Sequence, residues 1–181
     1  MTLNKENEVL VIADVLDQSC SKSIVEVYNK AGQFMRSFGE QHLKCSQDLT
    51  VAGDGRILVL DKDDDCSLTI HVFFPNGKHS FQFNVDKQKE PCNQRSRPSI
   101  ICYQALSHVV VAVPCKNSMG TGHCVKITVY ALKDEKHECV RNIELAANEQ
   151  VSTRGITVTF KGHVAVAILD RSEGNSRVIF V

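Results

Sequence analysis

The sequence contains no tryptophan, only four prolines, and no apolar run long enough to cross a membrane. It also lacks an excess of either charge, because 21 Lys and Arg residues balance 21 Asp and Glu residues. A globally basic nucleic-acid binder is therefore not indicated, although a local basic face is compatible with a neutral total. The polar first residues and Asp14 within the first apolar segment are not those of a signal peptide. We expect a cytoplasmic protein that does not contact a membrane.

The eight cysteines form no Cys-x-x-Cys pair, and the chain has no Asn-x-Ser/Thr sequon. We interpret them as reduced thiols, with the disulfides of a piece of a secreted protein as the alternative. A zinc site could be assembled only from Cys115, His123, Cys124, His137 and Cys139. Their spacing lacks the closely paired ligands of structural zinc sites, so we expect no metal and no other cofactor.

No segment shows a sustained helical period of apolar residues. The apolar runs are short, rich in Val and Ile, and bounded by Gly, Asp, Asn or Pro. Such runs are typical of β-strands, and the sequence predicts an all-β protein.

These runs recur in a fixed order. The clearest unit, residues 49–85, has four predicted strands, with Asp54-Gly55 and Pro75-Asn76-Gly77 at two of its turns. The preceding segment repeats it: Asp14 and Asp61 are 47 residues apart, and Gly32 and Gly77 are 45 apart. Two weaker copies follow. Four-stranded units in series bury their faces by stacking around an axis, so we predict a β-propeller, with a β-sandwich as the alternative.

Four segments resemble the NHL repeat of β-propellers. Residues 27–39 resemble the join between two repeats, residues 54–61 and 72–78 the middle of one, and residues 177–180 a strand of another. The resemblance implies one NHL-type propeller segment over residues 1–181, with approximate blades at 1–39, 40–85, 86–145 and 146–181. The acidic loop 62–67 and Pro114 depart from the family pattern.

The predicted strands number about fourteen, or about three and a half four-stranded antiparallel blades. The chain is expected to begin on the second strand of a blade and to end on a third, so it looks like a fragment. Open blade edges would then pair with missing blades or with another chain.

One set of cations is predicted to share a propeller face, because between-blade connections and second-to-third-strand loops lie on the same side. That face would also carry the carboxylates of Asp61, Asp63, Asp64 and Asp65, which oppose RNA, and a plain solvated linker is the alternative. The predicted partner-binding or RNA-binding residues are Lys87, Lys89, Arg95, Arg97, Lys116 and Arg171, with Lys22 and Lys44 as further candidates.

The resemblance is closest to animal tripartite-motif (TRIM) proteins with C-terminal NHL propellers. It implies an interaction module that docks a protein partner, within a ubiquitin ligase if a RING domain lies elsewhere in a longer protein. Single-stranded RNA binding by the basic face is the second hypothesis. No catalytic residue is recognised, and we expect that the chain is not an enzyme; an enzymatic propeller is the third hypothesis.

Overall fold

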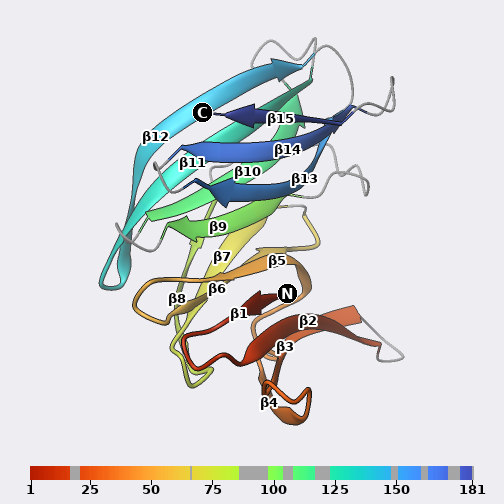
Figure 1. Cartoon of the computed structure of the whole chain (residues 1–181), viewed down its shortest axis with the longest axis vertical. Helices are drawn as coiled ribbons and strands as arrows, with labels where there is room; N and C mark the ends of the chain where they lie inside the picture. Colours follow the sequence, from red (N-terminus) through yellow and green to blue (C-terminus); the bar gives the residue numbers. More distant parts are fainter. Residues whose placement is uncertain are drawn as a thin grey trace. The chain divides into compact units, whose positions relative to one another are not determined.

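The computed structural model describes residues 1–16, 21–65, 67–85, 98–103, 108–116, 123–147, 151–159, 163–170 and 176–180. These residues form fifteen β-strands and no α-helix (Figure 1). Accordingly, the described part holds no helix with the length and apolarity that a membrane span requires. The chain divides into two compact units, Met1–Lys87 and Gln88–Val181, which are described in turn.

The first unit contains two antiparallel sheets, each of four strands in chain order. The first sheet consists of β1 (Thr2–Leu3), β2 (Val9–Leu16), β3 (Ser21–Tyr28) and β4 (Phe34–Phe38). The second consists of β5 (Cys45–Val51), β6 (Ile57–Lys62), β7 (Leu68–Phe73) and β8 (His79–Asn84).

The second unit contains a four-stranded sheet and a three-stranded sheet, again antiparallel and in chain order. The third sheet consists of β9 (Ser99–Tyr103), β10 (His108–Lys116), β11 (His123–Lys133) and β12 (Lys136–Ala147). The fourth consists of β13 (Val151–Val158), β14 (Val164–Asp170) and β15 (Ser176–Phe180).

This series of up-and-down sheets confirms the predicted repeat of four-stranded antiparallel units. The expectation that the chain begins on a second strand is wrong, because Thr2 pairs with Leu10 and Leu3 with Val9 to form a first strand. That strand has two residues, too few to show an apolar alternation in the sequence.

The core of the first unit lies between its two sheets. Val25 and Val27 of β3 are 0% exposed and pack with Leu49, Val59 and other apolar residues of the second sheet. Because side chains alternate across a strand, every second residue of β3 reaches this core. Each fully buried aliphatic side chain stabilises such a core by about 1.5–3 kcal/mol.

The core of the second unit is built in the same way. Val110 of β10 and Val125 and Ile127 of β11 pack with Val166 and Ile168 of β14. The third and fourth sheets are therefore stacked face to face.

Three hairpin turns of the first unit share one hydrogen-bonding pattern, which accounts for the glycine repeat in the sequence. In each turn the first residue's N–H donates to the fifth residue's carbonyl, and the fourth residue, a glycine, donates back to the first. Gly32, Gly55 and Gly77 occupy this fourth position with φ of 76°, 92° and 86°. Left-handed φ is readily adopted only by glycine. The turns span residues 29–33, 52–56 and 74–78.

Replacing Gly77 with Ala is expected to destabilise the first unit more than replacing Gly32 with Ala. Both positions have left-handed φ, which costs a non-glycine residue about 1 kcal/mol. A Cβ on Gly77 would also lie 2.8 Å from Phe38 ring atoms, whereas nothing lies within 4 Å of one on Gly32. We expect about 2 kcal/mol for Gly77→Ala and about 1 kcal/mol for Gly32→Ala, measured by urea unfolding. Equal losses would contradict this account of the Phe38 contact.

Candidate functional site

The structure does not place the predicted basic face. Lys87, Lys89, Arg95, Arg97 and Arg171 lie outside the described residues. Lys116 ends β10, and its side chain is also outside them. The face is therefore still a prediction.

The further candidates Lys22 and Lys44 are both described and exposed. Lys44 Nζ lies 3.0 Å from Asp64 Oδ2, so this cation and the acidic loop are in contact. The Asp64 carboxylate raises the pKa of the Lys44 ammonium. The pair is exposed, and such pairs add little stability.

Asp61, one of the two repeated aspartates, is a buried structural anchor with 3% exposure. Its carboxylate accepts hydrogen bonds from the backbone N–H of Lys44, at 3.1 and 3.2 Å, and from Ser46 Oγ, at 2.9 Å. Burial raises the pKa of Asp61 above its ordinary value, and the hydrogen bonds from Lys44, Ser46 and Cys45 oppose that rise. Asp61 therefore fixes the start of β5 against the end of β6.

Asp14, the other repeated aspartate, acts on the same segment through a serine. Ser23 Oγ donates to Asp14 Oδ1 at 3.0 Å and accepts from the Ser46 N–H at 2.9 Å. Ser23 is 0% exposed. Both aspartates thus hold the chain where it enters the second sheet. A structural role is therefore enough to explain why aspartate recurs at these two positions.

Large apolar side chains are exposed elsewhere in the first unit. Phe34 and Met35 at the start of β4 are 57% and 50% exposed, and Phe74 in the β7–β8 turn is 40% exposed. We call these three residues, with the turns 29–33 and 74–78, the turn face. Exposed apolar groups that cluster commonly mark interaction sites.

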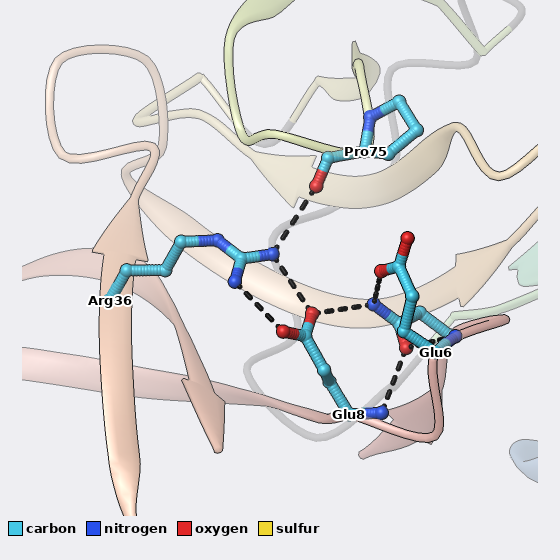
Figure 2. A network of polar contacts seen from close by, with 5 residues as sticks. Glu6, Glu8, Arg36 and Pro75 are labelled. Atoms are coloured by element: carbon cyan, nitrogen blue, oxygen red, sulfur yellow. Dashed lines mark hydrogen bonds and ion pairs between the residues drawn. The ribbon is translucent and has the colours of Figure 1, made fainter. Parts of the chain in front are cut away.

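Arg36 ties the elements of the turn face together (Figure 2). Its Nη1 and Nη2 donate to the two carboxylate oxygens of Glu8 at 3.0 and 2.9 Å, and Nη2 also reaches the Pro75 carbonyl at 3.4 Å. In the β3–β4 register Arg36 lies opposite Val27, which faces the core, whereas Phe34 lies opposite Tyr28 on the other side of the sheet. The contact with the Pro75 carbonyl therefore joins β4 to the β7–β8 turn, next to Phe74.

The Glu8 carboxylate is fixed from its other side by Asn4. Asn4 Nδ2 donates to Glu8 Oε2 at 2.7 Å, and Asn4 Oδ1 accepts from the Glu8 N–H at 2.8 Å. The hydrogen bond from Arg36 is the main cause that lowers the pKa of Glu8, and Asn4 lowers it further against the effect of burial. A bidentate pair held in this way orients Arg36 rigidly.

Phe34 is supported by a neighbouring aromatic ring. The rings of Tyr28 and Phe34 meet edge to face with centroids 5.9 Å apart. Tyr28 Oη donates to Glu26 Oε2 at 2.6 Å, and this hydrogen bond raises the pKa of Tyr28. Phe34 is therefore positioned before any partner binds, which lowers the ordering cost of binding.

Two features of the structure bear on the predicted cysteine chemistry. Cys115 and Cys124 are opposite each other in the β10–β11 register and form a disulfide. The expectation of reduced thiols is wrong for this pair, and its hairpin register is the reason. Cys45 and Cys139 are free thiols. Within the described ranges, no group of three or more His, Cys, Asp or Glu side chains is arranged to hold a metal ion.

Comparison with known proteins shows the fold and no family. No family model matches the chain. No curated protein matches it either. Among solved structures, a mutant NanB sialidase from Streptococcus pneumoniae is similar at 12% identity and TM-score 0.65, over 98% of this chain and 28% of that one. The propeller domain of the Trilobed protease from Pyrococcus furiosus is similar at 11% identity and TM-score 0.54, over 99% of this chain and 67% of that one.

The chain is therefore a β-propeller segment, and the predicted all-β fold of about three and a half antiparallel blades is confirmed. It spans little more than a quarter of the sialidase chain. The sandwich alternative fails, since four sheets follow one another in chain order.

The expectation that this chain is not an enzyme is corrected by the same comparison. We expected no enzyme because no catalytic motif was recognised in the sequence. A similar propeller fold nevertheless occurs in a sialidase. At 12% identity this likeness shows the fold alone, so it assigns no reaction to this chain.

The sequence analysis did not predict the turn face, because Phe34 and Phe74 fit the repeat as ordinary strand and turn residues. The local sequence carried no signal for it, because the register shift opposite Val27 and Tyr28, where Met35 is the extra residue, is not visible in the residues themselves.

Proposed function

We propose that this chain is an interaction module that docks a protein partner on the turn face of its first unit. The observation that carries the proposal is the exposure of Phe34 and Met35 at the start of β4 and of Phe74 in the β7–β8 turn, two elements that Arg36 joins. Aromatic residues, Met and Arg are enriched where proteins bind each other. The fixed positions of Phe34 and Arg36 favour a preformed surface.

The partner's chemistry follows from the charges in the same two turns. Lys30 lies in the turn 29–33 and Lys78 in the turn 74–78, and both are exposed. The Arg36 charge is already neutralised by Glu8. We therefore expect a peptide segment with an apolar or aromatic anchor and acidic flanking residues.

The NHL resemblance suggests the kind of longer protein in which this module would occur. Residues 27–39 and 54–61 carry the resemblance, and the positive φ of Gly32 and Gly55 supports the turn chemistry on which it rests. In a TRIM-type protein the propeller would present a substrate to a RING domain elsewhere in the longer chain. Ubiquitin-ligase activity would then belong to that domain.

The test uses a random-peptide display library selected on the chain. Wild type should enrich acidic peptides with an aromatic or apolar anchor, whose Kd is then measured by fluorescence anisotropy. Phe34→Ser with Phe74→Ser should weaken binding by about 100-fold, because two aromatic anchors buried by the partner contribute about 1.4 kcal/mol or more each.

The matched control is Val140→Ser in β12, since Val140 is 55% exposed and lies in the other unit. Its Kd should stay within about twofold of wild type, as expected of a surface residue outside the site. Equal binding by wild type and the Phe34/Phe74 variant would refute docking on the turn face.

Single-stranded RNA binding is the second candidate, favoured by Lys87, Lys89, Arg95 and Arg97 within one short segment. A short RNA oligonucleotide should then lose affinity steeply between low and physiological salt. Arg95→Glu with Arg97→Glu should abolish the binding. If that variant still binds the RNA, the basic-face hypothesis is wrong.

A further inference from the structure

Three histidines of the first unit are packed against one another. His71 in β7 is 5% exposed, and its Nδ1 lies 3.4 Å from Nε2 of His79 in β8. The His42 ring stacks on the His79 ring with centroids 4.0 Å apart and an interplanar angle of 15°. Phe73 completes the group, since its ring meets that of His79 edge to face at 5.2 Å.

His42 belongs to the connector of residues 39–43, which carries the chain from β4 to the segment that enters β5. The connector is a tight turn in which the N–H groups of His42 and Leu43 donate to the Gly39 carbonyl at 2.8 and 2.9 Å. Leu43 is 1% exposed and belongs to the same core cluster as Phe73. The connector is thus held on the second sheet by Leu43 in the core and by His42 on His79.

Among the described residues, no carboxylate is paired with these histidines. Across the sheet, His71 faces Val59 of β6 and Gln82 of β8, which are uncharged. The charged groups that act on His71 are His79 and His42, and the one that acts on His79 is His42. Glu40 of the connector is exposed. No ion pair resolved in the described part of the chain joins it to the rings.

We propose that the packed histidines form a pH-sensitive switch, in which protonation of His71 and His79 releases the connector 39–43, which carries His42, from β7 and β8. The two states are a connector docked on the neutral rings of His71 and His79, and a connector lifted away, with these two rings hydrated and charged. Like charges on His71 and His79, whose nearest ring nitrogens lie 3.4 Å apart, disfavour the docked state. The proposal does not depend on the docking function of the turn face.

The direction of the pH effect follows from burial. Burial chiefly, with His79 and His42 adding to it, lowers the pKa of His71 from 6.5 to about 4. Burial and His42 also lower the pKa of His79. Between these values the released state binds more protons than the docked state, so the docked state is favoured above pH 6.5 and loses stability as the pH falls toward 4. From pH 7.5 to pH 5.0, His71 alone should shift this equilibrium by about 30-fold.

The experiment measures amide hydrogen exchange at Leu43, expressed as a protection factor, in the full chain at pH 7.5 and 5.0. In wild type this factor should fall by about 30-fold. At both pH values Leu43 should be less protected than amides in the core of the unit, such as those of Val27 and Leu58, because those exchange only when the whole unit unfolds. Equal protection factors at all of them would show that Leu43 exchanges only by global unfolding and would overturn the proposal of a local switch.

Three variants complete the test. His71→Gln should reduce the fall at Leu43 to less than about threefold, because the main titrating group is gone. His42→Gln, at an exposed position, should fold normally and keep most of the fall, because His71 is still present. His163→Gln, an exposed histidine of the second unit, should behave as wild type. A wild-type fall of less than about threefold, or an undiminished fall in His71→Gln, would overturn the proposal.

Discussion

Replacing Phe73 with Ala is expected to lower the free energy of unfolding of the first unit by about 4 kcal/mol. Phe73 is 0% exposed and belongs to the core between the first two sheets. Its ring lies 5.1 Å from that of Phe38 on the facing sheet and closes over the connector near Gly39. Truncation to Ala removes buried apolar area and leaves a cavity. The two hydrogen-bonded sheets on either side cannot move together easily to fill it.

The control for this prediction is the next residue, Phe74. It is 40% exposed in the β7–β8 turn, so Phe74→Ala should change the free energy of unfolding by less than about 1 kcal/mol. Both variants would be compared with wild type by urea unfolding followed by far-UV circular dichroism. A similar small loss for both would mean that Phe73 is not in a packed interface.

Asp61→Ala is expected to cost about 3 kcal/mol, the second-largest effect. The methyl group would leave the part-buried Lys44 N–H and Ser46 Oγ without the acceptor that now lies 2.9–3.2 Å away. Asp65, an exposed residue of the acidic loop, provides the control. Asp65→Ala should alter stability by less than about 0.5 kcal/mol. Equal effects would show that Asp61 does not anchor the start of β5.

Asp61→Asn separates the charge from the hydrogen bonds. Because burial raises the folded-state pKa of Asp61, its contribution is fully present below the unfolded value of 3.8 and is lost as the pH rises through the raised folded value. Asn does not titrate. The stability of wild type relative to Asp61→Asn should therefore be greater in acid than at neutral pH, and the opposite trend would contradict the raised pKa.

Local chemistry made much of the fold predictable. Asp54-Gly55 and Asn76-Gly77 specify hairpin turns by themselves, because a left-handed glycine and an Asx side chain close the turn within five residues. The alternating Val and Ile residues then specify the strands on both sides. Thr2–Leu3 was missed since a two-residue strand has no period of its own.

The candidate site was less predictable because it depends on contacts between distant residues. Arg36 meets Glu8 across 28 residues and Pro75 across 39, and nothing in the local sequence selects these partners. The Cys115–Cys124 disulfide depends on which residues face each other in the β10–β11 hairpin. A shift of the register by one residue would have separated them. The predicted cations from Lys87 to Arg97 lie outside the described residues and remain a prediction.

Antiparallel sheets follow one another along the chain, each paired within itself, and cross-strand NOEs in an isotope-labelled sample test this arrangement. We expect NOEs within every sheet and no backbone pairing between strands of different sheets. Backbone pairing of β2 with β6, or helical NOEs across residues 109–113, would contradict it. The diagnostic pairs are Leu10 with Val27, Leu58 with Val72, Ala112 with Ile127, and Val166 with Ile179.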